Sequence, residues 1–330
     1  MKVRTGCNSL VGLTVVILIT SFTVMVHLKQ NRDLWMKKTQ TKAQVTSINK
    51  ELPTLSSAAV SMAESPVVYT FFDDLDNVYD QRRGGKTTSS EDHEILDAWT
   101  YSWKSMGFNP KVLTLNDAKR HPDYERFSNL LDEKVALGSN TAHDKVCYLR
   151  WLAVAASGGG ILTDYDTIPL RPPQPDDFIM PKKFTFYQSY VPSFMKGTPQ
   201  QWANVANIIL DEAVQPERRD MSIYSDMMAL SDASTNPRLQ GEIIEHRPRR
   251  IMDAKDLLEK DSDQYPMREC HRLYRLRAVH FHQISGTIKS PIVDNLLEKP
   301  IYKSQRATLM AKWITYWPTF FKDHCHGLNF

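Results

Sequence analysis

Apolar residues recur along this chain with the spacings of buried strands and amphipathic helices. A β-branched and aromatic run at 67–72 predicts a buried strand. Apolar side chains three and four positions apart predict a helix over 91–106, and a second strand follows at 111–115. This strand–helix–strand order is typical of an α/β domain, and the folded part should begin near Pro66.

The same alternation continues through the rest of the chain. A helix is predicted over 141–156, where Thr141 and Asp144 fit a capping box, and the glycines at 158–160 end it. A short strand at 161–163 then leads into Asp164-Tyr165-Asp166. Later elements follow from the same spacings: strands at 184–187 and 278–282, and helices over about 199–214 and after Ser222.

The chain before Pro66 has a different pattern. An apolar run within 10–27 is long enough to cross a thin bilayer, and no small-x-small cleavage site follows it. It therefore predicts an uncleaved signal anchor behind a short tail at 1–9, with a cleaved signal peptide as the alternative. Basic residues flank the run on both sides, so charge does not set its orientation. Residues 28–65 are polar and without periodicity, as in a stem, which leaves 66–330 as the folded domain.

Charge and cysteine content narrow the classes of function. The formal net charge of +3, without any polybasic run, gives no electrostatic reason to expect a nucleic-acid partner. The four cysteines match no zinc-binding pattern. If the C-terminal part is lumenal, Cys270 and Cys325 could pair, whereas Cys147 lies in a helical pattern typical of a buried thiol.

The candidate chemistry centres on Asp164 and Asp166, directly after a predicted strand. Residues two positions apart at a strand end point to the same side, and two carboxylates there repel unless a cation lies between them. Hard divalent cations prefer oxygen ligands and keep positions open for phosphate oxygens. The pattern thus favours a metal site that neutralises a leaving diphosphate, with a solvated turn as the alternative.

The residues around this pair resemble a known family. The segments CYLRWL at 147–152 and GGILTDYD at 159–166 are similar to the glycosyltransferase sugar-binding region containing a DXD motif. That family includes initiating Golgi α-mannosyltransferases and related α-galactosyl- and α-N-acetylglucosaminyltransferases. The resemblance implies a GT-A fold, which is an α/β fold with a mixed, mostly parallel central sheet and flanking helices.

Function and location are also implied by this resemblance. The donor would be a nucleotide sugar, the cofactor a divalent metal, usually Mn2+, and the acceptor a glycan, glycoprotein or glycolipid. Transfer would retain the anomeric configuration, in a single-pass type II protein of the Golgi membrane with a lumenal catalytic domain. By analogy, Asp166 would be a catalytic metal ligand, with Asp164 nearer the ribose or a metal-bound water and Tyr165 at the donor.

The sequence departs from the family pattern at two places. The family has an aspartate three residues before its arginine, where this chain has Cys147, and the nearest carboxylate is Asp144. An additional residue also separates Arg150 from the aspartate pair. Asp144 is therefore predicted either to contact the donor or to cap the helix, and Arg150 either to contact the donor or to form a buried ion pair.

A second group of candidate residues follows the 278–282 strand. Residues 282–289 resemble the His-x-x-Gly-x-x-Lys element of glycogenin-like transferases, with one additional residue before Gly286. This implies His282 as a metal ligand, and Gly286 and Lys289 as diphosphate contacts. Strand alternation puts His280 and His282 on the same side, so either could bind metal, and the spacing to Gly286 favours His282. Hydrogen-bonded structural histidines are the alternative.

Other candidates lie at element ends. Ligands bind at the carboxyl ends of strands in such folds, so Thr70, Phe71 and Phe72 could contact the base and ribose, although the phenylalanines could equally be core. Asp226 begins a predicted helix and could be catalytic, orienting the acceptor, or be only a charge at the helix N-terminus.

Two other functions compete with sugar transfer. Residues 71–78 resemble the motif of haloacid-dehalogenase-type phosphatases, with Asp74 as nucleophile and Asp76 as general acid. The late acidic metal motif of those enzymes has no counterpart in this sequence. A catalytically inactive, transferase-like lumenal binding protein is the other alternative.

Overall fold

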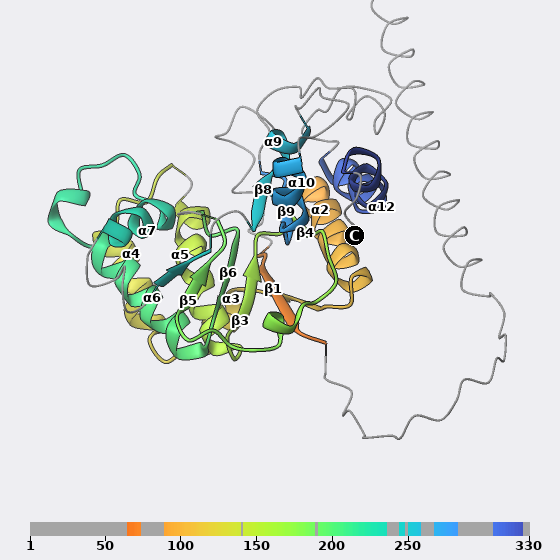
Figure 1. Cartoon of the computed structure of the whole chain (residues 1–330). Helices are drawn as coiled ribbons and strands as arrows, with labels where there is room; N and C mark the ends of the chain where they lie inside the picture. The colour runs from red at the N-terminus through yellow and green to blue at the C-terminus, as the bar shows by residue number, and fades with distance from the viewer. Residues whose placement is uncertain are drawn as a thin grey trace, which may run out of the picture. The chain divides into compact units, whose positions relative to one another are not determined.

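Two β-sheets and the helices around them make up the described structure, a computed structural model (Figure 1). The described residues are 65–73, 89–139, 141–188, 191–235, 244–247, 250–258, 267–282 and 306–325. All of them belong to the unit Ala63–Phe330. The expected tail, anchor and nearly all of the stem lie outside these ranges. None of the helices within them combines the length and the apolarity needed to cross a membrane.

The larger sheet has six strands in the order β2-β1-β3-β6-β5-β7. Their bounds are β1 Val67–Phe71, β2 Asn109–Leu113, β3 Gly160–Thr163, β5 Phe184–Phe186, β6 Phe194–Gly197 and β7 Ile244–His246. β1 pairs in parallel with β2 and β3, and β5 with β7, while β6 runs antiparallel to β3 and β5. The expected mixed, mostly parallel sheet is thereby confirmed.

The smaller sheet has three strands in the order β4-β9-β8. These are β4 Thr167–Pro169, β8 Ile251–Asp253 and β9 Ala278–His280. β9 is antiparallel to β4 and parallel to β8, so His280 lies opposite both Thr167 and Asp253. This register brings the last residue of β9 to the segment where Asp164 and Asp166 connect β3 with β4.

The predicted helices form close to the expected bounds, and further helices accompany them. The bounds are α2 Ser89–Ser105, α3 Leu115–Ala118, α4 Tyr124–Lys134, α5 Thr141–Ala156, α6 Pro199–Ala213, α7 Asp226–Thr235, α9 Ala254–Leu258, α10 Met267–Tyr274 and α12 Arg306–His324, with 3-10 turns η1 Pro175–Asp177 and η2 Pro216–Arg218. Gly159 lets α5 end against the start of α6. It has a φ of +68°, and a Cβ there would lie 2.6 Å from the Pro199 nitrogen.

Alternate residues of the central strands face different cores. Tyr69 and Leu162 pack in the core formed with α4, α5, α6 and α7, whereas Val68 and Ile161 pack with Trp99 of α2. α12 covers a third core, built on the smaller sheet. The Cys270–Cys325 pairing that the sequence left open is present as a disulfide, with a Cα–Cα distance of 5.4 Å, and it joins α10 to the end of α12.

Candidate metal and donor site

The turn between β3 and β4 presents the aspartate pair. The Asp164 backbone N–H donates to the Ser193 carbonyl at 3.1 Å, and the Thr167 N–H donates to the Asp164 carbonyl at 3.0 Å. The tight turn directs both carboxylates towards the end of β9. His280 Nε2 lies 3.2 Å from Asp166 Oδ1 and 3.8 Å from Asp164 Oδ2. One ligand atom from each of the three residues fits within 4.8 Å of the others, so Asp164, Asp166 and His280 could hold a metal ion.

The histidine of this group is His280, whereas the spacing to Gly286 favoured His282. The expected common side of the strand is confirmed, because the two rings lie 5.3 Å apart. The β4–β9 register places His280 beside the pair, while His282 lies beyond the strand. The His282 side chain is 44% exposed, and its Nε2 lies 3.7 Å from Asp253 Oδ1. Gly286 and Lys289 lie outside the described residues.

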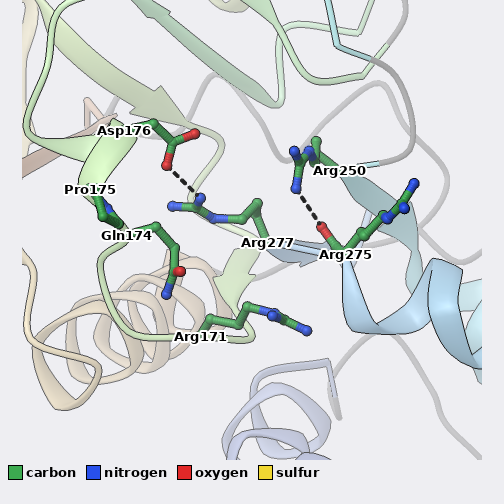
Figure 2. A pocket seen from close by; sticks show the side chains of 7 residues that line it. All are labelled: Arg171, Gln174, Pro175, Asp176, Arg250, Arg275 and Arg277. Carbon is green, nitrogen blue, oxygen red and sulfur yellow. Dashed lines mark hydrogen bonds and ion pairs between the residues drawn. The ribbon is translucent and has the colours of Figure 1, made fainter. Parts of the chain in front are cut away.

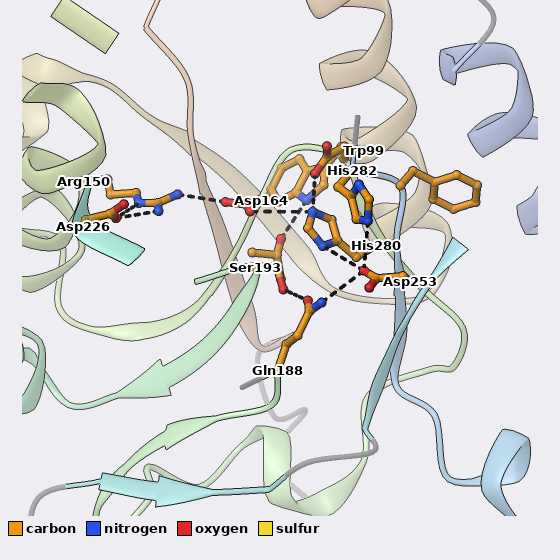
Figure 3. Close-up of polar contacts among 12 residues, drawn as sticks. Trp99, Arg150, Asp164, Gln188, Ser193, Asp226, Asp253, His280 and His282 are labelled. Carbon is orange, nitrogen blue, oxygen red and sulfur yellow. Dashed lines mark hydrogen bonds and ion pairs between the residues drawn. The ribbon is translucent and has the colours of Figure 1, made fainter. Parts of the chain in front are cut away.

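Each aspartate gives one oxygen to an arginine and turns the other towards His280. Arg150 of α5 donates from Nη1 to Asp164 Oδ1 at 2.9 Å (Figure 3). Arg306, the first residue of α12, donates from Nη1 to Asp166 Oδ2 at 3.1 Å. The remaining oxygens, Asp164 Oδ2 and Asp166 Oδ1, are the two that face His280. Two arginines from different helices therefore fix the orientation of both carboxylates.

The remaining oxygen of Asp166 supports a cation at this place. Asp166 Oδ1 is buried and accepts no hydrogen bond of good geometry among the described residues, with His280 Nε2 facing it at 3.2 Å. Such an atom is costly unless a ligand satisfies it. Two ligands about 2.1 Å from an octahedral ion lie roughly 3 Å apart, close to the 3.2 Å between Asp166 Oδ1 and His280 Nε2. Carboxylate and imidazole together suit a divalent ion, but they do not select which one.

The ionisation of the group is unequal. Burial, together with the charge of Asp166, raises the pKa of Asp164 to about 6, although Arg150 opposes this. Burial would also raise the pKa of Asp166, but His280 and Arg306 outweigh it and lower that pKa. Burial opposes the charge on His280, yet the neighbouring carboxylates raise its pKa. The two carboxylates thus favour a positive charge at this place, which an imidazolium or a bound cation would supply.

A chain of polar side chains stands behind His280. Asp253 Oδ1 lies 3.5 Å from His280 Nδ1 and accepts a hydrogen bond from Gln188 Nε2 at 3.1 Å. Ser193 Oγ in turn donates to Gln188 Oε1 (Figure 3). Carboxylates in this position commonly orient a metal-ligating histidine. Sequence reasoning missed Asp253 and Arg306, because only the pairing of β8 with β9 and the packing of α12 bring them to the site.

Comparison with known proteins places the aspartate pair within one family model. A model described as a domain of unknown function, DUF8765, matches residues 54–186. The matched segment includes Asp164 and Asp166 but ends before His280 and Arg306. No curated protein matches the chain. The comparisons therefore assign no activity, and inferences about function depend on the geometry of the site.

Arg150 and Asp226 form the buried ion pair that was one of the alternatives. Asp226 Oδ2 accepts from Arg150 Nη2 at 2.6 Å and from Trp151 Nε1 at 3.1 Å. Asp226 begins α7, is 2% exposed, and is linked to Asp164 through Arg150. Its described contacts are those of a positioning residue. Asp144 is also buried, and it accepts a hydrogen bond from the Gly138 N–H at 2.8 Å, which fastens the segment before α5.

The aromatic candidates separate into a core residue and a pair beside the site. Phe71 packs against the larger core. Phe72 meets Tyr165 edge-on, with ring centroids 5.5 Å apart, and the Tyr165 hydroxyl donates to Asp92 at 3.1 Å. Thr70 is fully buried at the end of β1, and its Oγ1 has no hydrogen-bond partner among the described residues. Phe72 and Tyr165 are thus partly exposed beside the pair, whereas Thr70 is enclosed in the fold.

Proposed function

We propose that this chain is a metal-dependent glycosyltransferase with a GT-A fold. It would transfer a sugar from a nucleotide sugar to a hydroxyl of a glycan, glycoprotein or glycolipid, with retention of configuration. It would do so as a type II protein of the Golgi membrane. The observation that carries the proposal is the convergence of Asp164, Asp166 and His280 beyond the carboxyl end of β3, with one buried carboxylate oxygen left without a hydrogen bond.

Each residue of the group has a defined task in this proposal. Asp166 and His280 hold the divalent ion, with Asp164 beside it. A bound ion supplies Lewis-acid stabilisation to a leaving diphosphate. Arg306 and Arg150 hold the carboxylates of Asp166 and Asp164 in the orientation that faces the ion, which limits the reorganisation needed during reaction.

The donor would approach from the side of β1. Phe72 and Tyr165 offer an aromatic surface for the base or ribose, whereas Thr70 is fully buried and does not face the donor. Arg150 is occupied by Asp164 and Asp226, so it acts on the donor through Asp164 rather than by direct contact. Gly286 and Lys289 would contact the diphosphate, as their resemblance to the glycogenin-like element implies.

A nucleotide-sugar screen tests the proposal. The purified chain is incubated with UDP- and GDP-sugars and Mn2+, and release of the nucleoside diphosphate is measured. We expect turnover of at least one donor, loss of turnover on chelation, and recovery on adding Mn2+. Asp166→Asn should lower turnover by more than about 100-fold, beyond the 10–100-fold typical of residues outside the ligand sphere. The exposed Asp220 provides the matched control Asp220→Asn, which should retain turnover.

Three outcomes would contradict the proposal. If Asp166→Asn turns over donors as well as the unmodified chain does, the pair is not a metal site. If phosphate esters are hydrolysed instead, and only Asp74→Asn abolishes that hydrolysis, the chain is a phosphatase. Mn2+ binding that depends on Asp166, without turnover of any donor, would identify the inactive binding protein.

A further inference from the structure

A cavity lined by arginines lies at the opposite end of the smaller sheet from the aspartate pair. In the β4–β9 register, Thr167 faces His280 at one end and Pro169 faces Ala278 at the other. Arg171 follows this second end of β4, and Arg277 precedes β9. Together with Arg250 and Arg275 they line a cavity of about 350 Å³ (Figure 2). β4 and β9 therefore separate the cavity from the site described above.

Only part of the positive charge in this cavity is balanced by carboxylates. Arg277 is buried and donates to Asp176 Oδ1 at 3.0 Å and to Asp177 Oδ2. Arg250 donates from Nη1 to the Arg275 carbonyl at 3.4 Å, a neutral acceptor. In the described part of the chain, no carboxylate lies within ion-pair distance of Arg250 or Arg275. The Arg250 guanidinium therefore remains as net positive charge at the cavity, and the exposed Arg275 adds a second unbalanced charge beside it.

Arg171 adds a further positive charge to the lining of the cavity, and its side chain is held in place by two contacts. Arg171 donates from Nε to the Leu276 carbonyl at 2.9 Å, and its guanidinium lies 4.4 Å above the Tyr274 ring. Burial lowers the pKa of Arg171, and the charges of Arg277 and Arg250 lower it further. Like charges gathered in a partly buried space repel each other, and an anion placed among them would relieve that repulsion.

The side of the cavity formed by Gln174 and η1 is fixed by hydrogen bonds before any ligand binds. Lys196 Nζ donates to the carbonyls of Asp176 at 2.6 Å and Asp177 at 2.9 Å, which ties η1 to β6. The Asp177 carboxylate accepts from the Gln174 N–H at 2.7 Å. Gln174 lines the cavity and adds an amide to the arginines. A rigid wall of this kind lowers the entropic cost of binding.

We propose that this cavity binds the phosphate or sulfate group of a small anionic ligand, independently of the metal site. Guanidinium groups present forked N–H donors that match the oxygens of such groups. The volume suits a ligand of about sugar-phosphate size. In the sequence, Asp177 is followed directly by Phe178, Ile179 and Met180, which are 48%, 68% and 46% exposed. The anionic group could therefore belong to a phosphorylated sugar or to a phospholipid headgroup, and the experiment must distinguish these two ligands.

Calorimetric titration of the full chain, freed of metal on a chelating resin, tests the proposal. The probes are glucose, glucose 6-phosphate, glucose 6-sulfate and the short-chain lipid dihexanoyl phosphatidic acid. Arg250→Gln/Arg275→Gln removes two cavity charges. The control Lys119→Gln/Arg219→Gln removes two exposed charges elsewhere. We expect a phosphate or sulfate probe, but not glucose, to bind, with at least tenfold weaker binding in the cavity variant and less than twofold change in the control.

Each result either supports or overturns the proposal. Tighter binding of the sugar esters identifies a sugar phosphate or sulfate as the source, and tighter binding of the lipid identifies a headgroup. If no anionic probe binds, or both double variants weaken binding equally, the cavity is not an oxyanion site. Because the titration contains no metal and no donor, its result does not depend on whether the chain transfers sugars.

Discussion

The two ends of the β4–β9–β8 sheet carry opposite charges and balance them differently. At one end, Asp164 and Asp166 are each held by an arginine, and His280 lies between them. At the other end, carboxylates balance Arg277, while Arg250 and Arg275 have no carboxylate partner in the described structure. The acidic end is thus organised by buried protein partners, and the basic end retains charge for a ligand.

This difference has a physical basis in burial. The acidic end is enclosed, so an unpaired carboxylate there would carry a large desolvation cost, and charged partners are needed to hold it. Arg275 is exposed to solvent, where water can solvate its charge when no ligand is bound. A site for a small ion needs fixed ligands, whereas a site for a larger anion can leave its charges hydrated until binding.

The Cys270–Cys325 disulfide connects the helices that serve the two ends, and its removal should give the largest effect on stability. α10 leads to Arg275 and Arg277, while α12 begins with Arg306 and ends near Cys325. Breaking a crosslink between residues 55 positions apart should cost about 4 kcal/mol of unfolding free energy. Cys325→Ser, measured by urea denaturation, should therefore be strongly destabilised.

A second serine variant separates the crosslink from the loss of a sulfur atom. Cys147 is the free cysteine of the described structure, and Cys147→Ser should cost far less than Cys325→Ser. In the crosslinked chain, added dithiothreitol should reproduce the Cys325→Ser effect. Equal destabilisation of both variants would mean that the two ends are held together by packing rather than by the disulfide.

Local sequence patterns predicted the aspartate pair of the acidic end, but not the residues from distant segments that contact the pair. The strand β3, the glycine-ended helix α5 and the carboxylates that follow are contiguous, so their spacing alone indicated the site. The choice between His280 and His282 depends on how β9 pairs with β4, and the spacing to Gly286 carries no information about that pairing. The resemblance-based ligand His282 was therefore favoured over the one that the register brings to Asp166.

The partners from distant segments gave no local signal. Arg306 is one of many basic residues until α12 packs on the smaller sheet, and Asp253 is an ordinary strand end until β8 pairs with β9. α12 itself was not predicted, although its buried residues recur at three- and four-residue spacing; Pro318 lies within the helix, where proline is unfavourable. The arginines of the cavity likewise come from separate segments and form no polybasic run.

Asp253→Asn should sharpen the comparison at the acidic end. The carboxylate lies 3.5 Å from His280 Nδ1, and its loss removes the charge that orients the ring and raises its basicity. We expect Mn2+ affinity to fall by about 10–100-fold, the range typical of such partners, with little change in binding at the cavity. Isothermal titration of Mn2+ measures the first effect, and glucose 6-phosphate titration measures the second.

The neighbouring helix supplies the control for this variant. Asp256 lies on α9 and is exposed, so Asp256→Asn removes the same charge from the same part of the surface without touching His280. Its Mn2+ affinity should remain within about twofold of the unmodified chain, since long-range effects of an exposed charge are screened by salt. A similar loss of affinity in both variants would show that Asp253 acts through net charge rather than by holding His280.

Asp176→Asn should give the smallest effect, because its side of the Arg277–Asp176 ion pair is open to solvent. Burial alone would raise the pKa of Asp176, but the hydrogen bond and charge of Arg277 lower it below 3.8. A lowered carboxyl pKa stabilises the fold above the unfolded-state pKa, and the contribution disappears as the pH falls through the folded-state value. The side chain is 47% exposed, so screening limits the contribution to about 1 kcal/mol or less.

Urea midpoints of Asp176→Asn and the unmodified chain should therefore differ slightly near neutral pH and converge as the solution is acidified, while Asp220→Asn should show no such convergence. A difference of several kcal/mol at neutral pH would mean that the basic end is as enclosed as the acidic one.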